Sequence, residues 1–434
     1  MGEMNRCGVT VFGLGKIGLP LAVQFALKGC DVVGIDVKPE LVESINRGEE
    51  PFPGELNLSD NLKTTLKNGN FQASLNDAGA LGSSDVVVVA VPLIVDDEGK
   101  PNFSYLDDVT FKIGKSIRKG TLICYETTLP LGSTRDRFLR KIEEISGLSC
   151  PNDFNLVFSP ERVSSGRIFS DLRRYPKIVG GITDKCTERA TKFYESVLDF
   201  DVRNDLGETN GVWKMGSSEE AEFVKLAETT YRDVNIALAN QFALDANTRG
   251  LDIGRIINSA NSQPYSMIHN PGISVGGHCI PVYPLLYLST NPGADLIRVA
   301  RELNNEMPAK AIKRIQEVLG NLSGEVVAVF GVSYRPGVKE TAFSGAFRLK
   351  TELQVLGAKP VFIDPLYTSN ELRELGFEPA PEDNPDVGIV IIHTHYEELL
   401  DNLVKSFPNC HLIFDGRGMV NPASLPPKVT LAKI

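Results

Sequence analysis

The stretch VTVFGLGKIG (residues 9–18) decides the fold. A β-rich run, residues 9–12, breaks into a GxGxxG glycine pattern, and a helical pattern then continues to Gly29. A second short strand, DVVGID, ends at Asp36, 18 residues after Gly18. A strand, a glycine turn, a helix and a strand ending in an acidic residue are typical of a doubly wound α/β domain that binds a dinucleotide.

This glycine loop has the properties that a nucleotide cofactor requires. Its glycines permit a close approach of a pyrophosphate to the helix N-terminus, where unpaired N–H groups and the helix dipole favour anions. Asp36 is expected to accept hydrogen bonds from ribose hydroxyls and to repel a 2′-phosphate, which favours NAD over NADP. A glycine-rich turn without a ligand is the alternative, and the strand–helix–Asp36 context argues against it. The residues expected to bind NAD are Gly13, Gly15, Lys16, Ile17, Gly18, Asp36, Pro92 and Thr128.

Strands and helices continue to alternate through the first half of the chain. SDVVVVAVP (residues 84–92) has the continuous apolar run of a buried parallel strand. TLICYETTLP (residues 121–130) and FNLVFSPER (residues 154–162) predict further strands that end in polar loops. This alternation indicates a doubly wound sheet that extends to about residue 205.

The middle of the chain has a different pattern. Residues 219–249 contain neither Gly nor Pro and predict one long helix that stops at Gly250. ADLIRVARELNN (residues 294–305) predicts another helix, which ends before Pro308. A mostly helical connector between two α/β units is the simplest interpretation.

The last third of the chain repeats the β-α rhythm of the first. Its expected strands are GEVVAVFGVSY (residues 324–334), AKPVFIDP (358–365), VGIVIIHTH (387–395) and HLIFDGRG (411–418). The predicted fold class is therefore α/β, with two Rossmann-like doubly wound domains joined by a helical domain.

Composition and charge exclude several classes of protein. The formal net charge of −10 argues against a general nucleic-acid binder, which normally carries a basic stripe. The apolar run of residues 86–95 is far shorter than the about 20 residues of a membrane span, and Pro92 interrupts it. The seven cysteines are odd in number and form no CxxC pair, which predicts a reducing, cytoplasmic environment without disulfides.

A second group of chemically distinctive residues lies in ISVGGHCIP, residues 273–281. Two consecutive glycines, Gly276 and Gly277, let the backbone approach a bulky group. Cys279 is either an accessible thiolate nucleophile or, as for most single cysteines, a small buried hydrophobic residue. His278 is not assigned as its base, because adjacent side chains do not point the same way in a regular element.

Polar residues also gather on the long helix and at two strand ends. Lys225, Thr229 and Arg232 lie at i, i+4 and i+7 and form one polar stripe, for which a solvated face is the alternative. Glu161 and Arg162 follow a strand end, where α/β folds place their ligands. His393 and His395 alternate on a strand, but no carboxylate or thiol partner has convincing spacing, so no metal site is predicted.

These pieces, in this order, resemble the UDP-glucose/GDP-mannose dehydrogenase family over nearly the whole chain. The resemblance is closest to its UDP-N-acetylmannosamine branch, on the blocks TTYRDVNIALAN (residues 229–240) and PGISVGGHCIPVYP (residues 271–284). The motifs that carry the family resemblance are GLGKIGLP (13–20), Asp36, ETTLPLGSTR (126–135), SPERV (159–163), KLAETTYRDVNIALANQFA (225–243), GGHCIPVYP (276–284), FGVSYRP (330–336) and DGRG (415–418).

The resemblance implies a nucleotide-sugar 6-dehydrogenase that oxidises a C6 alcohol to a carboxylate with two NAD⁺ and one water. It implies that Cys279 attacks the C6 aldehyde, so that a thiohemiacetal and then a thioester form on the sulfur. Lys225 would stabilise the oxyanion, Glu161 would be the acid/base residue, and Thr128 would position a water or the substrate hydroxyl. The residues expected to bind the substrate are Arg162, Lys225, Thr229, Arg232, Gly276, Arg335 and Arg417.

The chain departs from the usual family pattern at three positions. Thr229 stands where the family usually has Asn, Tyr283 where it has Asp, and Ala342 where it has Arg. Val282 stands where the UDP-glucose branch typically has Lys, which favours a UDP-N-acetylhexosamine, either N-acetylmannosamine or N-acetylglucosamine, as the substrate. The alternatives are UDP-glucose, a two-electron hydroxyacid dehydrogenase of the 6-phosphogluconate type, and a non-enzymatic NAD sensor.

The expected division is an NAD-binding domain at residues 1–205, a central helical domain at 206–307 and a UDP-sugar-binding domain at 308–434. The central helix is longer than one small domain needs, which predicts a homodimer that buries its apolar face. The resemblance also implies a role in the assembly of surface polysaccharide. No metal, nucleic acid or membrane partner is expected.

Overall fold

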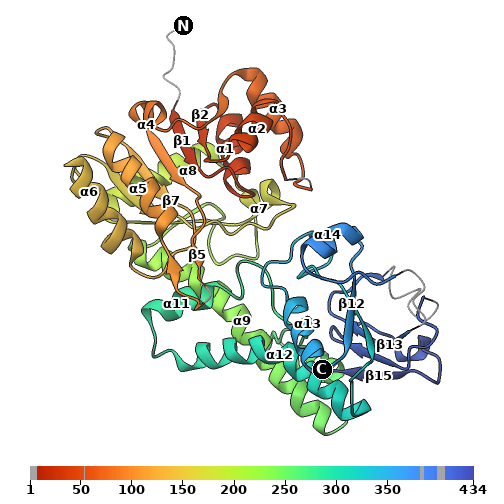
Figure 1. Ribbon diagram of the computed structural model, residues 1–434. Coiled ribbons are helices and arrows are strands. Elements are labelled where there is room, and N and C mark those ends of the chain that lie inside the picture. The colour runs from red at the N-terminus through yellow and green to blue at the C-terminus, as the bar shows by residue number, and fades with distance from the viewer. Residues whose placement is uncertain (1–6, 53, 97, 382–385, 398–405) are drawn as a thin grey trace. The chain divides into compact units, whose positions relative to one another are not determined.

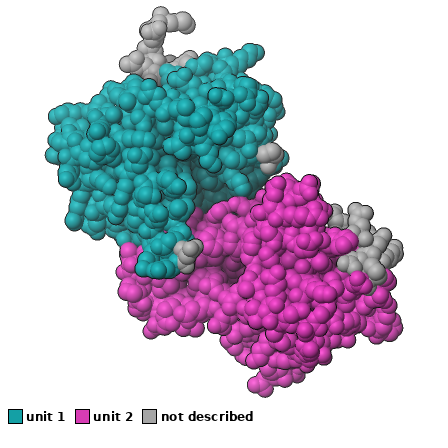
Figure 2. All heavy atoms as spheres, in the orientation of Figure 1, with its two compact units in different colours: residues 1–227 teal, residues 228–434 magenta. Residues whose placement is uncertain are grey.

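The chain forms two compact units, unit 1 at residues 1–227 and unit 2 at residues 228–434 (Figure 2). The boundary falls within helix α9 (Ser218–Thr248), which belongs to both units. The division into three domains stays a prediction. The computed structural model describes residues 7–52, 54–96, 98–381, 386–397 and 406–434.

Unit 1 is built on an eight-stranded sheet with the strand order β10-β9-β8-β7-β4-β1-β2-β3 (Figure 1). Neighbouring strands are parallel except β8 and β9, which run antiparallel. The four valines of β4 are all buried, as expected for an interior strand. The strands are β1 (Gly8–Phe12), β2 (Asp31–Ile35), β3 (Phe71–Ser74), β4 (Val86–Val89), β7 (Leu122–Tyr125), β8 (Asn155–Phe158), β9 (Lys177–Gly181) and β10 (Val212–Lys214), with β5 (Ile94–Val95) and β6 (Pro101–Asn102) pairing separately.

Helices cover both faces of this sheet, as the prediction of a doubly wound domain requires. Tyr125 of β7 points to one face, where it stacks on Phe138 at 4.3 Å and shares a hydrogen bond with Thr110. Cys124, the preceding residue of β7, faces Tyr194 on the opposite side. The helices are α1 (Gly18–Leu27), α2 (Pro39–Asn46), α3 (Leu58–Asn68), α4 (Ala78–Ser83), α5 (Ser104–Ser116), the π-helix η1 (Thr134–Leu139), α6 (Arg140–Ser146), α7 (Ile168–Arg174) and α8 (Asp184–Val197).

Unit 2 contains a five-stranded, fully parallel sheet with the order β12-β11-β13-β14-β15. This second doubly wound sheet confirms the predicted fold class, and β13 is buried along its whole length. The strands are β11 (Val326–Phe330), β12 (Lys359–Ile363), β13 (Val387–Ile392), β14 (Leu412–Asp415) and β15 (Thr430–Lys433). The helices are α10 (Ile253–Ala260), α11 (Tyr283–Thr290), α12 (Asp295–Leu319), α13 (Gly345–Val355), α14 (Ser369–Glu374) and the 3₁₀ turn η2 (Pro422–Ser424).

The two predicted central helices have different outcomes. Helix α9 matches the run without Gly or Pro, and Gly250 beyond its end has a left-handed φ of +64°. The expected end of α12 before Pro308 is wrong, because the helix continues through this proline to Leu319. Met307 and Ala311 on either side of Pro308 are in the buried core of unit 2, so tertiary packing outweighs the about 3 kcal/mol that an interior proline costs. Within the described residues, no helix has both the length and the apolar composition that crossing a membrane requires.

Candidate active site

The glycine loop of unit 1 has the geometry of a dinucleotide-binding turn. Gly13 has a φ of +88° and its N–H donates to the carbonyl of Ile35 at 2.8 Å. A Cβ at Gly18 would lie 1.8 Å from the Gly13 carbonyl oxygen, so this position requires glycine. A Cβ at Gly15 would meet nothing within 4 Å, so the space beside the middle glycine is open. The loop therefore fits a cofactor pyrophosphate, which must approach the backbone at Gly15.

Asp36 lies beside this loop and holds it in place. Its carboxylate accepts hydrogen bonds from the N–H groups of Leu14 at 2.9 Å and Lys38 at 3.1 Å. A carboxylate has about four acceptor sites, so two remain for ribose hydroxyls. The residue fits the role that its position after β2 predicts.

The other expected NAD ligands follow the ends of neighbouring parallel strands. Strands β1, β4 and β7 are adjacent, so their carboxyl ends lie at one edge of the sheet. Lys16 is exposed in the loop after β1, with Ile17 as the N-cap residue of α1. Pro92 is exposed after β4, and Thr128 is buried after β7. This arrangement agrees with binding at the carboxyl edge of a doubly wound sheet.

Two of the expected catalytic residues contact each other in unit 1. The Lys225 ammonium donates a hydrogen bond to the backbone carbonyl of Glu161 at 2.6 Å. Lys225 and Glu161 are 7 % and 9 % exposed, and Thr229 on α9 is fully buried. The solvated-face alternative is therefore wrong for Lys225 and Thr229, while Arg232 is half-buried.

The Glu161 carboxylate belongs to a buried charge cluster that the sequence analysis missed. Lys177 at the start of β9 forms ion pairs with Glu161 and with Glu126, the latter at 2.8 Å. The Tyr194 hydroxyl donates to the other oxygen of Glu126 at 2.6 Å. Glu126 directly follows the apolar strand β7, and this charged residue after a buried strand is the signal that could have revealed it. We call Glu126, Glu161, Lys177 and Tyr194 the Lys177 cluster.

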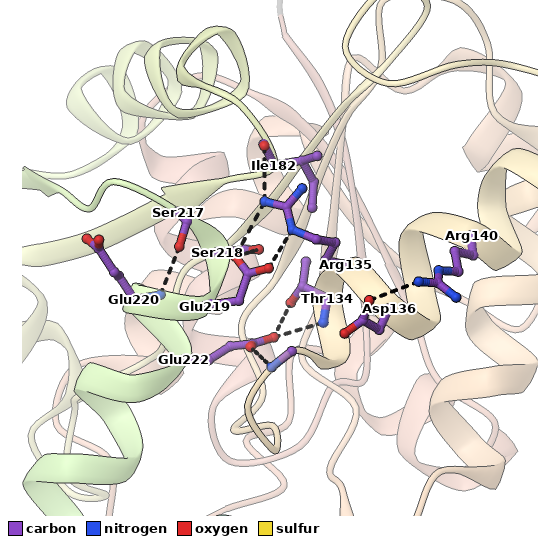
Figure 3. A network of polar contacts seen from close by, with 11 residues as sticks. Thr134, Arg135, Asp136, Arg140, Ile182, Ser217, Ser218, Glu219, Glu220 and Glu222 are labelled. Carbon is purple, nitrogen blue, oxygen red and sulfur yellow. Dashed lines mark hydrogen bonds and ion pairs between the residues drawn. The ribbon is translucent and has the colours of Figure 1, made fainter. Parts of the chain in front are cut away.

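A separate polar network fixes the first turns of α9, which carry Lys225 (Figure 3). Glu222 accepts hydrogen bonds from the N–H of Gly132 at 2.6 Å and from the N–H and hydroxyl of Thr134 at 2.8 and 2.6 Å. Arg135 pairs with Glu219 at 2.5 Å. Burial raises the pKa of Glu222 to about 7, whereas Arg135 and other donors overcome desolvation and lower the pKa of Glu219 to about 2. Lys225 lies one turn after Glu222, so this anchoring also positions its ammonium.

In unit 2, Cys279 is exposed at the end of a tightly packed loop. A Cβ at Gly276 would lie 2.6 Å from Tyr334, and one at Gly277 would lie 3.0 Å from the same ring. Tyr334 of the same chain is therefore the bulky group that the paired glycines accommodate. The Cys279 thiol donates to the Tyr283 hydroxyl at 3.6 Å, so the buried-hydrophobe alternative for Cys279 is wrong.

His278 points to a different partner from its neighbour Cys279. Its imidazole forms a hydrogen-bonded pair with Glu340. This contact agrees with leaving His278 unassigned as the base. His393, by contrast, is fully buried between the Ser274 hydroxyl at 2.9 Å and the Gly331 carbonyl at 2.8 Å, and desolvation lowers its pKa to about 3. His393 therefore has a structural role.

Two arginines expected to bind the nucleotide also lie in unit 2. Arg335 is exposed, with its guanidinium carbon 5.8 Å from the centre of the Tyr334 ring. Arg417 donates to the carbonyls of His393 at 2.6 Å and Ser274 at 3.4 Å, and desolvation lowers its pKa to about 10. Arg417 lines a cavity of about 650 Å³ together with Arg255 and Lys433. Three cationic side chains around one cavity fit an anionic ligand.

Comparisons with known proteins agree with this site. Residues 7–198 match the model of the NAD-binding domain of the UDP-glucose/GDP-mannose dehydrogenase family, and residues 219–306 match the model of its central domain. The UDP-N-acetyl-D-mannosamine dehydrogenase of Pyrococcus horikoshii is 39 % identical over 78 % of this chain and 79 % of its own length. The protein of the same name from Methanocaldococcus jannaschii is 32 % identical over 96 % of this chain and 94 % of its own length.

A solved structure extends the similarity to the fold of the whole chain. The structure of UDP-D-ManNAc dehydrogenase from Pyrococcus horikoshii has a TM-score of 0.86, with 32 % identity and 98 % coverage of both chains. The NAD-binding family model confirms NAD as the cofactor expected from the glycine loop. The chain belongs to the UDP-glucose/GDP-mannose dehydrogenase family.

Proposed function

We propose that this protein is an NAD-dependent UDP-N-acetyl-D-mannosamine 6-dehydrogenase that oxidises the C6 alcohol to a carboxylate in two steps. The observation that carries the proposal is the identity of 39 % to a relative named UDP-N-acetyl-D-mannosamine dehydrogenase. An exposed Cys279 and a buried Lys225–Glu161 pair in the same chain support it, because a covalent route to an acid requires these groups.

Each residue has a defined task in this reaction. NAD⁺, held by the Gly13–Gly18 loop and Asp36, supplies the hydride acceptor for both oxidations. The Cys279 thiolate adds to the C6 aldehyde, so that a thiohemiacetal and, after loss of two electrons and a proton, a thioester form on its sulfur. The Lys225 ammonium stabilises the oxyanion at C6.

Water then cleaves the thioester and regenerates the thiolate. Glu161 acts as the base that takes a proton from this water, and Thr128 orients the water or the substrate hydroxyl. Arg162, Thr229, Arg232 and Gly276 contribute to the sugar site, and Arg335 and Arg417 bind the diphosphate.

The substrate is tested by initial rates of NADH formation with a panel of UDP-sugars. We expect the highest kcat/KM for UDP-N-acetylmannosamine, a lower value for UDP-N-acetylglucosamine and the lowest for UDP-glucose. A preference for UDP-glucose would assign the chain to that alternative. Oxidation of 6-phosphogluconate instead of any UDP-sugar would contradict the proposal.

We also infer that the protein is a homodimer that pairs through α9. Tyr231, Leu238 and Phe242 lie on one stripe of this helix and are 55 %, 46 % and 39 % exposed. Sedimentation at micromolar concentration should give twice the 47.4 kDa mass of the chain. The variant Leu238→Asp/Phe242→Asp should be monomeric, whereas Leu75→Asp, at an equally exposed leucine of unit 1, should stay dimeric.

The proposed location and pathway follow from the same chemistry. All seven cysteines are free, which fits a reducing cytoplasm. A UDP-linked uronic acid is an activated sugar, so the next reaction class is glycosyl transfer, as in the assembly of surface polysaccharide.

A further inference from the structure

The Lys177 cluster contains two carboxylates that share one ammonium. Lys177 Nζ is 2.8 Å from Glu126 and also pairs with Glu161, and the three side chains are 8 % exposed or less. The ammonium lies 4.7 Å from the centre of the Tyr194 ring, on which it has a cation–π contact. Two negative charges and one positive charge are therefore held in a nearly dry environment.

The reversed direction of β9 brings this lysine to the cluster. Strands β7 and β8 are parallel, so Glu126 and Glu161 follow their carboxyl ends at one edge of the sheet. Strand β9 is antiparallel to β8, with Phe158 opposite Gly180, so β9 begins at that same edge. Continuing this register places Lys177 opposite Glu161. A parallel β9 would have carried Lys177 to the other edge.

Glu161 is held at both ends. Its carboxylate pairs with Lys177 and its backbone carbonyl accepts from Lys225. Glu161 and Lys177 also line a cavity of about 10 Å³, which is about the space that one water requires. A purely structural ion pair needs neither the second carboxylate nor an adjoining water-sized space.

We propose that Lys177 is a positioning residue for Glu161, and that Glu126 competes for the same ammonium and thereby sets the pH range in which Glu161 acts as a base. The inference rests on the proposed function, in which Glu161 activates water. Lys177 keeps the Glu161 carboxylate ionised and oriented. Glu126, as the second claimant, prevents the ammonium from weakening Glu161 as a base.

The groups that face the cluster agree with this division of charge. Tyr194 and Arg189 lie on α8, Cys124 on β7 and Lys225 on α9. Desolvation and the nearby Glu161 charge raise the pKa of Glu126 to about 8, against the opposing effect of Lys177. Desolvation lowers the pKa of Lys177, but the two carboxylates outweigh it and raise this pKa overall. At neutral pH the cluster thus keeps its ammonium and shares its carboxylate protons.

The test is the pH dependence of kcat with saturating NAD⁺ and UDP-N-acetylmannosamine. In Lys177→Met, two buried carboxylates lack their cation, so the acidic limb of the profile should move up by about 1 to 3 pH units. In Glu126→Gln, Glu161 has the ammonium to itself, so the limb should move down. Lys177→Arg keeps the charge and should keep the limb near that of the wild type. KM for the sugar should change less than kcat in each variant.

The double variant Lys177→Met/Glu126→Gln removes one charge of each sign and controls for folding. Its acidic limb should lie between those of the two single variants. If Lys177→Met does not fold, the downward shift in Glu126→Gln and the intermediate limb of the double variant carry the test. Limbs that stay together, or shift in the same direction, would overturn the proposal.

A second readout needs no turnover. The thermal unfolding midpoint of Glu126→Gln should fall less between pH 5 and 9 than that of the wild type, because one buried carboxyl no longer has to ionise. Equal pH slopes would contradict the shared ammonium. Absence of turnover in the wild type would contradict the proposed function instead, so the two failures are distinguishable.

Discussion

The two units open with the same turn and use it differently. Gly13 after β1 and Gly331 after β11 have φ values of +88° and +87°, and each donates to the end of the adjacent strand, to Ile35 at 2.8 Å and Ile363 at 2.7 Å. In unit 1 the chain enters α1 at once, at Gly18. In unit 2 a longer loop precedes α13, which begins at Gly345. Only the first turn therefore presents a helix N-terminus to a pyrophosphate.

The acidic residue beside each turn shows the same contrast. Asp36 is half-buried and accepts two backbone hydrogen bonds. Asp364 is 3 % exposed and accepts from Val332, Ser333, Leu366 and the Tyr396 hydroxyl at 2.8 to 3.1 Å. The first carboxylate keeps free acceptor sites for a ligand, whereas the second is used up in holding its own loop. A shared fold thus does not imply a shared ligand.

The largest expected effect separates the chemistry of unit 2 from the cofactor site of unit 1. Cys279→Ser should lower kcat by more than about a thousandfold, because a serine hydroxyl is a far weaker nucleophile than a thiolate. NAD⁺ affinity, measured by calorimetry, should not change, since the glycine loop is in unit 1. Substantial turnover by Cys279→Ser would rule out the covalent route.

Exchanging the same substitution between the two aspartates tests the comparison directly. Asp364→Ala leaves four buried donors without an acceptor and should destabilise the fold by about 3 kcal/mol or more, with little effect on NAD⁺ affinity. Asp36→Ala should weaken NAD⁺ binding about tenfold and reduce the preference over NADP⁺. Urea unfolding and NAD⁺ titration of both variants give the four values. An Asp36 variant with unchanged cofactor preference would contradict the assignment.

A smaller effect is expected at the middle glycine of the loop. Gly15→Ala places a methyl group in open space, so the unfolding midpoint should be unchanged while NAD⁺ affinity falls about tenfold through steric exclusion of the pyrophosphate. Gly293→Ala is a matched control, because a Cβ there also meets nothing within 4 Å. Equal NAD⁺ affinities of the two variants would show that Gly15 does not line the cofactor site.

The smallest effect is a difference in how pH acts on the two units. The raised folded pKa values of Glu222, about 7, and Glu126, about 8, mean that their contribution to stability is fully present below about pH 4.5 and is lost as pH rises through 7 to 8. The lowered pKa of His393, about 3, has the opposite sign, so its contribution is present above about pH 6.5 and is lost as pH falls towards 3. Hydrogen exchange should therefore show unit 1 loosening first at alkaline pH and unit 2 first at acid pH. The same order at both extremes would contradict these assignments.

The sequence predicted the features that depend on local pattern. The glycine loop, Asp36, the buried strand β4 and the run of α9 all follow from residue type and spacing, and the structure confirms them. Lys225 was placed on a helix face by spacing alone. Its contact with the carbonyl of Glu161 depends on tertiary structure and could not be read from the pattern.

The features that the sequence did not predict depend on strand direction and packing. Lys177 begins a short strand and resembles an ordinary surface charge, because only the antiparallel pairing of β9 with β8 shows that it is buried. Pro308 has the local signature of a helix end, but the core of unit 2 keeps α12 intact around it. Glu126 falls within a motif that was recognised, yet its role needs the position of Lys177.

The most direct test of the account is the number of NADH molecules formed per UDP-N-acetylmannosamine consumed when the sugar is limiting. Two NADH per sugar, with the uronic acid as the product, are predicted by a thioester on Cys279 that water hydrolyses. One NADH per sugar would show that oxidation stops at the aldehyde, and it would contradict the roles assigned to Cys279, Lys225 and Glu161.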